Sequence, residues 1–359
     1  RQALDWHGKA DFLDNAESSL QQGKGNQMPA NVLVTGGAGY IGSHAVLALR
    51  DAGHAVAVID DLSTGFRWAV PDSAAFYQGN VSDGALVDSI VAAHGIEAVM
   101  HFAGSIIVPE SVTDPLKYYR NNTAATRDLL ESVVRNGIRH FIFSSTAAVY
   151  GSPEQVPVDE TTPRLPINPY GTSKLMTELM LADVAAAHPL NYAVLRYFNV
   201  AGADPQGRTG QSTAGATHLI KIAVEAALGK RASVAVYGTD YATPDGTGVR
   251  DYIHVSDLAA AHVAALDRLM ADPDTSLTLN CGYGRGFSVL EVLDAVDRVA
   301  GVKRDRVLAP RRGGDSDALV ATGELILQQL DWVPRYADLD TIVGHALAWE
   351  RELAQRSNV

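Results

Sequence analysis

The chain has 359 residues, of which 47% are hydrophobic and 19% charged, and its formal net charge is −12 at pH 7. This size and composition predict a large buried core, built as two lobes or as one large α/β unit. The negative charge argues against binding to nucleic acid or to an anionic membrane. The single cysteine, Cys281, excludes an internal disulfide and suits a reducing compartment, and no apolar run is long enough to span a membrane. We therefore expect a soluble, cytoplasmic protein without a metal site.

Residues 1–27 are polar and lack the apolar core of a signal peptide. Because Met28 is a possible start, we interpret residues 1–28 as an N-terminal tail or an expression remnant. Apolar, β-branched runs follow at 32–34, 55–59, 98–102, 141–143 and 193–195, separated by stretches of helical periodicity. Such runs are typical of a parallel sheet that is covered by helices on both faces.

A glycine-rich turn lies between the first apolar run and the helical stretch after it. Gly36, Gly39 and Gly42 stand where the dinucleotide fingerprint places its glycines, after a strand and at the start of a helix. Glycines allow the tight turn and let backbone N–H groups approach a pyrophosphate. The second run ends in Asp60 and Asp61, where a carboxylate accepts hydrogen bonds from a ribose diol and repels a 2′-phosphate. This pattern predicts a dinucleotide site and favours NAD over NADP.

Further cofactor contacts are expected beyond the carboxyl ends of the other parallel strands. Small residues at such an end let a dinucleotide pass close to the backbone. The candidates from these positions are Asn80, Val81, Phe102, Ala103 and Gly104.

The predicted fold class is α/β, with a Rossmann-type, doubly wound parallel sheet and a smaller, mixed α/β lobe that binds the substrate. We assign residues 29–200 to the sheet domain and expect residues 252–281 to return a helix and a strand to it. Residues 201–359 form the second lobe, because the sequence changes near residue 203 to a loop rich in Gly, Asp and Gln. The two lobes therefore interleave along the chain.

Tyr170 and Lys174 are four residues apart in a stretch that begins with Pro169, a favourable residue for the start of a helix. Residues at i and i+4 are neighbours on a helix surface. A lysine beside a tyrosine favours the phenolate, so we expect Lys174 to lower the pKa of Tyr170 toward neutrality and make it a general base. Thr146 ends the preceding strand and is placed to reach the same cavity.

Five runs of sequence resemble a known family: 34–44, 145–151, 169–171, 196–199 and 245–255. From Asn31 to about Trp349 the chain resembles the extended short-chain dehydrogenase/reductases, and within them the enzymes that epimerise UDP-sugars at C4. The run 245–255 is the most specific, since a generic dehydrogenase does not need it.

The resemblance implies a role for each of the catalytic candidates. It implies that Tyr170 is the base, that Lys174 tunes it and contacts the nicotinamide ribose, and that Thr146 is a hydrogen-bond partner for the substrate. It also implies that the NAD site includes, besides the aspartates, Tyr40, Ile41, Asn121 and Tyr197.

The resemblance further implies a clamp for UDP. Arg250 and Arg312 would hold the diphosphate through bidentate, charge-assisted hydrogen bonds, and Asp315 would bind the uridine ribose. The residues that would line the diphosphate and uracil pocket are Asn199, His218, Leu219, Val236 and Tyr237. Lys221 replaces a proline that is common in this segment of the family.

The activity implied is an NAD-dependent interconversion of UDP-galactose and UDP-glucose, by transient oxidation at C4, rotation of the 4-keto sugar and hydride return, in a homodimer. Leu319 would bound the sugar pocket, and its intermediate size leaves UDP-xylose/UDP-arabinose and UDP-N-acetylhexosamines open as alternatives. Dehydration of the sugar needs an acidic pair after Thr146, where Ala147 and Ala148 stand instead. A non-catalytic NAD sensor is a further alternative, although such proteins typically lose the Tyr/Lys pair.

Overall fold

The computed structural model describes residues 29–213 and 215–356, so the tail predicted over residues 1–28 lies outside the described residues. The first half of the chain alternates strands and helices. In order, its elements are β1 (Asn31–Thr35), α2 (Tyr40–Asp51), β2 (Ala55–Asp60), η2 (Arg67–Ala69), β3 (Ala75–Gln78), α3 (Gly84–His94), β4 (Ala98–His101), α4 (Val108–Thr113), α5 (Pro115–Tyr118), the π-helix η3 (Tyr119–Ala124), α6 (Ala125–Arg135), β5 (His140–Thr146), η4 (Ala147–Tyr150), α7 (Pro169–Ala187) and β6 (Asn191–Tyr197).

The second half contains shorter strands and longer connections. Its elements are β7 (Asn199–Ala201), α8 (Leu219–Ala227), β8 (Ser233–Tyr237), β9 (Val249–His254), α9 (Val255–Ala271), β10 (Leu277–Cys281), β11 (Gly286–Ser288), α10 (Val289–Ala300), β12 (Asp305–Ala309), β13 (Ala318–Leu319), α11 (Glu324–Gln329) and α12 (Leu339–Arg356). Within the described ranges, no helix has the length and apolar character needed to cross a membrane.

Seven parallel strands form the main sheet, in the order β10-β6-β5-β4-β1-β2-β3. The strand order reverses between β1 and β4, and ligands of open α/β sheets bind at such a reversal, beyond the carboxyl ends of the strands. After the chain has left the sheet at β6, α9 packs against α2, and β10 adds the seventh strand beside β6. The predicted Rossmann-type α/β fold is confirmed.

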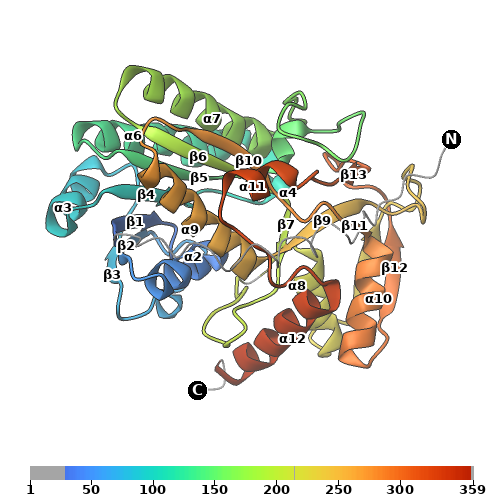
Figure 1. Cartoon of the computed structure of the whole chain (residues 1–359). Helices are drawn as coiled ribbons and strands as arrows, with labels where there is room; N and C mark the ends of the chain where they lie inside the picture. The colour runs from blue at the N-terminus through green and yellow to red at the C-terminus, as the bar shows by residue number, and fades with distance from the viewer. Residues whose placement is uncertain (1–28, 214, 357–359) are drawn as a thin grey trace.

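Alternate residues of the central strands point to opposite faces of the sheet, and both sets are apolar. Val32 and Val34 of β1 pack with Ile142 of β5 on one face, under α2 and α9. Leu33 of β1 packs with Phe141 of β5 on the other face, under α3, α6 and α7. Figure 1 shows these helices as two layers with the sheet between them. Burial on both faces explains why the strands are continuous apolar runs.

The smaller lobe has a core of its own, formed by α8, α10, α12 and strand β8, and the more exposed strand β12 pairs with β8. Figure 1 places this lobe beside the carboxyl edge of the main sheet. Strand β9 joins the two parts, because it pairs with β7 that follows β6, and also with β11 and β13. The edge of the sheet and strand β9 therefore form the two sides of the candidate site.

Candidate active site

The glycine turn between β1 and α2 is pressed against the end of β4. Gly36 has φ +69°, a left-handed conformation that favours glycine, and its N–H donates to the carbonyl of Ile59 (2.9 Å). A Cβ at Gly36 would lie 2.7 Å from the backbone nitrogen of Ala103. Gly39 is the N-cap of α2 and supplies no side-chain cap, and Gly42 lies in the first turn of this helix. The turn thus presents an uncapped helix start, which attracts an anion.

Asp60, at the end of β2, ties the glycine turn to the next strand. Its carboxylate accepts hydrogen bonds from the N–H groups of Ala38 (2.9 Å) and Leu62 (2.8 Å). Burial raises the pKa of Asp60, these two N–H groups oppose the rise, and the nearby charge of Asp61 adds to it. Asp61 is exposed and accepts from the N–H of Ser63 (2.9 Å). Both acids stand at the carboxyl edge of the sheet, where a ribose diol would bind.

The remaining cofactor candidates lie at or beyond the carboxyl ends of the strands. Tyr40 and Ile41 begin α2, Asn80 and Val81 follow β3, Phe102, Ala103 and Gly104 follow β4, Asn121 lies in η3, and Tyr197 ends β6. The Tyr40 hydroxyl donates to the carbonyl of Gly202 (2.7 Å), and the Asn121 amide donates to the hydroxyl of Ser105 (3.0 Å). An uncapped helix start, a turn closed to side chains and an acidic pair fit the pyrophosphate and a ribose of NAD.

The N-terminal end of helix α7 packs against η4 and the end of β5. The side chain of Asn168 caps the helix by accepting from the N–H of Gly171 (2.9 Å), and Pro169 occupies the first helical position. A Cβ at Gly171 would lie 2.6 Å from the carbonyl oxygen of Ala148, so only glycine allows this close approach. The approach sets the buried Tyr170 beside Thr146, whose hydroxyl favours the ionised form of the phenol and also accepts from the N–H of Ala148 (3.1 Å).

The pKa values of Tyr170 and Lys174 differ from those expected from the sequence. Lys174 is buried, and its ammonium donates to the carbonyl of Ser144 (3.0 Å) and lies 4.9 Å from the centroid of the Phe143 ring. Burial lowers the pKa of Lys174 to about 8, against an opposing effect of Glu178. Burial also raises the pKa of Tyr170, and the hydrogen bond with Thr146 only partly offsets this rise. The predicted lowering of the Tyr170 pKa by Lys174 is wrong in direction, because desolvation of the buried phenol dominates and raises the pKa.

The candidates for UDP binding come from six separate segments. Asn199 begins β7, His218 caps α8, Leu219 begins that helix, Val236 and Tyr237 end β8, Arg250 lies in β9, Arg312 and Asp315 lie between β12 and β13, and Leu319 ends β13. In the pairing of β13 with β9, Leu319 stands opposite Arg250. Leu319, the candidate that bounds the sugar pocket, and Arg250, a candidate for the diphosphate, are therefore on neighbouring strands.

The two arginines are held differently. The guanidinium of Arg250 donates to the carbonyls of Val249 and Ser316 (both 2.8 Å) and is thereby fixed to the backbone. The guanidinium of Arg312 lies 4.9 Å from the centroid of the Tyr237 ring and donates to the carboxylate of Asp315 (2.9 Å). Both Arg312 and Tyr237 are about 40% exposed, so this group is open to a ligand.

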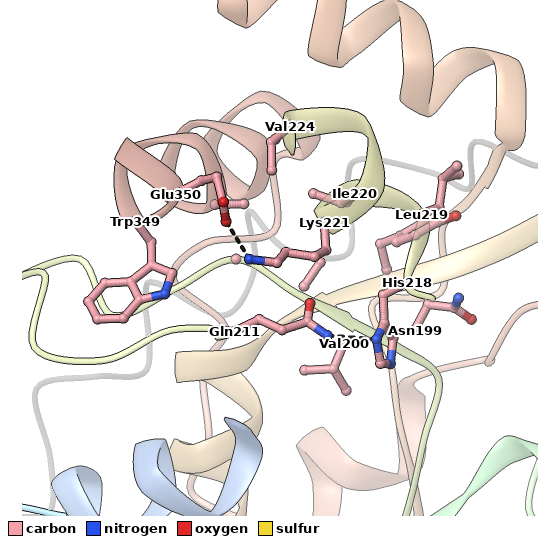
Figure 2. A pocket seen from close by; sticks show the side chains of 14 residues that line it. Asn199, Val200, Gln211, His218, Leu219, Ile220, Lys221, Val224, Trp349 and Glu350 are labelled. Carbon is pink, nitrogen blue, oxygen red and sulfur yellow. Dashed lines mark hydrogen bonds and ion pairs between the residues drawn. The ribbon is translucent and has the colours of Figure 1, made fainter. Parts of the chain in front are cut away.

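Two further candidates differ in their surroundings. Val236 is fully buried in the core of the smaller lobe, so its side chain packs there instead of facing a ligand. His218 lines a cavity with Asn199 and Leu219 (Figure 2). Its Nδ1 accepts from the side-chain amide of Gln211 (2.6 Å), and burial lowers its pKa, so the ring is neutral and carries its proton on Nε2. Gln211 was not predicted as a site residue, because no local sequence pattern indicates its contact with His218.

Two more residues near Tyr170 were missed from the sequence. The ring of Tyr118 meets the ring of Tyr170 edge to face, with 6.4 Å between centroids. Glu178 lies one turn after Lys174, accepts from the hydroxyl of Ser145 (2.6 Å) and forms a buried ion pair with Arg196. The i,i+4 spacing from Lys174 was a readable signal for Glu178, whereas no pattern pointed to Tyr118.

Residues 32–282 match the model of the NAD dependent epimerase/dehydratase family. The chain belongs to this family. A UDP-glucose 4-epimerase of Azospirillum brasilense is 58% identical over 324 residues, which cover 90% of this chain and 93% of that protein. The family prediction and the prediction of NAD as cofactor are thereby confirmed.

Solved structures agree with these matches. A UDP-glucose 4-epimerase of Stenotrophomonas maltophila with bound NAD and formylated UDP-arabinopyranose has a TM-score of 0.87 and 39% identity, covering 91% of this chain and 99% of that one. One from Bifidobacterium longum in complex with NAD+ and UDP has a TM-score of 0.86 and 39% identity, covering 90% and 98%. Within the residues that the structure describes, no cluster of three or more His, Cys, Asp or Glu is arranged to hold a metal ion.

Proposed function

We propose that this protein is a 4-epimerase that interconverts UDP-galactose and UDP-glucose and retains NAD throughout. The observation that carries the proposal is the contact between the start of α7 and the end of β5, which sets the buried Tyr170 beside the buried Thr146. This contact lies at the same edge of the sheet as the glycine turn, which fits NAD. The 58% identity to a UDP-glucose 4-epimerase supports the choice of reaction.

Tyr170 is the group that takes the proton from the sugar O4 hydroxyl, and Thr146 holds the same oxygen by a hydrogen bond. A bound NAD would supply the hydride acceptor and donor for C4, and its positive charge would favour the phenolate form of Tyr170. The buried site around Tyr170 and Lys174 keeps water away from the reacting carbon. Lys174 contributes its positive charge below its pKa of about 8.

The substrate must be held by its nucleotide and left free at its sugar. Arg250 and Arg312 supply charge-assisted donors for the diphosphate, and Asp315 supplies an acceptor for the uridine ribose. The sugar side is bounded by the apolar side chain of Leu319, which offers no hydrogen bond to hold one face of the ring. The oxidised sugar can therefore turn and present its other face before C4 is reduced again.

Proton NMR of the anomeric region tests this function directly. The purified protein, without added cofactor, is incubated with UDP-galactose, UDP-N-acetylgalactosamine and UDP-arabinopyranose in separate tubes. We expect UDP-galactose to be converted to UDP-glucose, and the relative rates rank the other two sugars. No conversion in any tube, even after NAD is added, would rule out the epimerase.

We also propose that the protein is a homodimer whose subunits meet through η3, α6 and α7. A groove between these helices is lined by Tyr119, Thr123, Ala124, Arg127, Met176 and Met180. Met176 and Leu179 are 39% and 49% exposed, which suits a covered apolar face. Met176→Glu should give a monomer in sedimentation velocity, and a dimer in that variant would exclude this interface. The cytoplasmic location stays a prediction.

A further inference from the structure

A buried ion pair joins α8 to the C-terminal helix α12. Lys221 and Glu350 point toward one another across the cavity in Figure 2 and form an ion pair, and their side chains are only 5% and 3% exposed. Glu350 also accepts from the ammonium of Lys230 (2.5 Å), and Lys221 lies 3.5 Å from Glu225. Lys221, which the sequence alone does not explain, therefore has its main partner 129 residues away.

The pair lies at the end of α8 that carries two candidates for substrate binding. His218 is the N-cap of α8, Leu219 is its first residue and Lys221 its third. The carbonyl of His218 accepts the N–H of Ile222 (3.0 Å), so the first turn is closed around these residues. A lysine in the first turn opposes the helix dipole, and burying its charge is costly. Helix formation therefore does not explain Lys221, and holding this turn in place does.

The residue beside Glu350 fastens α12 to the cofactor lobe. Trp349 packs against Trp68 of η2, with 5.9 Å between ring centroids, and its indole N–H donates to the hydroxyl of Ser212 (3.2 Å). A Cβ at Gly210 would lie 2.4 Å from the Trp349 ring, so the loop before α8 closely follows this side chain. Two consecutive residues of α12 thus contact the cofactor lobe and the substrate-binding helix.

We propose that Lys221 and Glu350 are positioning residues for the UDP-sugar site. By fixing the first turn of α8 to α12, the ion pair holds His218 and Leu219 at the required place relative to the cofactor lobe. A buried ion pair adds little net stability but can specify one arrangement of the elements that it joins. The proposal rests on the proposed function, because it takes a UDP-sugar as the ligand.

The test compares UDP binding with catalysis in the NAD-containing protein. In Glu350→Gln and in Lys221→Met we expect the Kd of UDP, measured by calorimetry, and the KM of UDP-galactose to rise about tenfold. The kcat and the amount of bound NAD should stay near the wild-type values. The conservative Lys221→Arg variant should restore both constants to within about twofold. A merely structural role would instead lower Tm and the active fraction, and leave Kd and KM unchanged.

A double variant tests the proposal even if the single variants fail to fold because one buried charge is left without its partner. Lys221→Met/Glu350→Leu removes both charges, so no uncompensated buried charge remains between these positions. It should fold and still bind UDP about tenfold more weakly. Asp340, which lies on α12 like Glu350, provides the matched control. Asp340→Asn breaks an exposed ion pair with Arg298 of α10 (Nη2–Oδ1 2.5 Å). It should leave both Kd and KM unchanged.

The failure of each proposal gives a different result. If the folded, NAD-containing variants of Lys221 and Glu350 bind UDP as tightly as the wild type, the positioning role is wrong while the proposed function stands. If the wild type fails to convert UDP-galactose, the proposed function is wrong, and the calorimetric comparison still decides whether the ion pair controls UDP binding. If the wild type also fails to bind UDP, both proposals are wrong.

Discussion

The two ligand sites of this molecule are built in different ways. At the proposed cofactor site the candidate groups for the pyrophosphate are backbone N–H groups of one turn and one helix start, and a single carboxylate, Asp60, fixes this turn to the next strand. At the proposed substrate site the candidate binding groups are side chains from six segments. Two of these segments meet where β13 pairs with β9, so that Leu319 stands opposite Arg250.

Asp251 shows what holds the second arrangement together. Its fully buried carboxyl accepts hydrogen bonds from the N–H groups of Tyr283 (3.1 Å), Gly284 (3.0 Å) and Ala321 (3.4 Å), and burial raises its pKa to about 7. It thereby ties β9 to the segment after β13. Filling the glycine turn with a side chain should therefore abolish NAD binding. Removing one side chain of the substrate site should instead weaken the binding of the UDP-sugar by a limited amount.

The largest effect is expected at the catalytic contact, which belongs to neither ligand site alone. Tyr170→Phe removes the proton acceptor, so kcat should fall by roughly a thousandfold while NAD stays bound. Steady-state assays with UDP-galactose and release of the nucleotide by heat would measure both quantities. Tyr192→Phe is the control, because it also removes a tyrosine hydroxyl, but near the N-terminal end of β6 and away from the carboxyl edge where Tyr170 lies. More than a tenth of the wild-type rate in Tyr170→Phe would exclude this tyrosine as the base.

The cofactor site should fail as a whole when its turn is filled. Gly36→Ala places a Cβ 2.7 Å from a backbone nitrogen at a residue with φ +69°, so we expect the purified protein to lack NAD. Gly53→Ala is the matched control, since Gly53 has φ +93° and a Cβ there would meet no atom within 4 Å. It should carry the same type of backbone strain, of order 1 kcal/mol, and keep NAD. Equal NAD contents in the two variants would contradict the role of the turn.

A smaller, graded loss is expected at the substrate site. Arg312→Ala should raise the KM of UDP-galactose about tenfold to hundredfold, the range expected for lost charge-assisted hydrogen bonds, without changing kcat or bound NAD. Its neighbour Arg311 provides the control, because it pairs with Asp240 (2.7 Å) and lies over the ring of Tyr241. Arg311→Ala should leave KM unchanged. Equal increases in KM for the two variants would show that only general charge matters here.

The smallest effect concerns stability and follows from the buried Lys174. Its pKa is 10.5 in the unfolded chain and about 8 in the folded one. The unfolded chain therefore binds more protons between pH 8 and 10.5, so the stability of the wild type rises with pH in this window. At pH 7 the full cost of about 3 kcal/mol is present. In urea denaturation, NAD-free Lys174→Met should be more stable than the wild type by about 2 kcal/mol at pH 7, and the difference should shrink above pH 8. A difference independent of pH would contradict the assigned burial effect.

The same contrast explains what could be predicted from the sequence. The central strands were readable because residues such as Leu33 and Phe141 are buried on a sheet covered on both faces. The glycine turn was readable because all its parts lie within a few residues. Strand β3 was predicted only indirectly, through the placement of Asn80 and Val81 beyond its carboxyl end, because its residues Ala75–Gln78 are at most half buried at the sheet edge.

Properties that arise from packing could not be predicted in the same way. Lys174 was identified correctly as a residue of α7 near Tyr170. The direction of the Tyr170 pKa shift was predicted wrongly, because the burial that raises this pKa depends on the whole fold. The side chain of Val236 packs in the core for the same reason. The partner of Lys221 lies on the last helix, and no short-range pattern links these two positions.

Transfer of a C4 label tests the central claim most directly, since the proposed chemistry keeps the hydrogen of C4 within the closed site around Tyr170. UDP-galactose carrying deuterium at C4 is converted in ordinary water, and the product UDP-glucose is analysed by proton NMR and mass spectrometry. We predict that the product retains the deuterium at C4. Loss of the deuterium to solvent would contradict an internal oxidation and reduction, and would indicate instead that the hydrogen leaves C4 as an exchangeable proton.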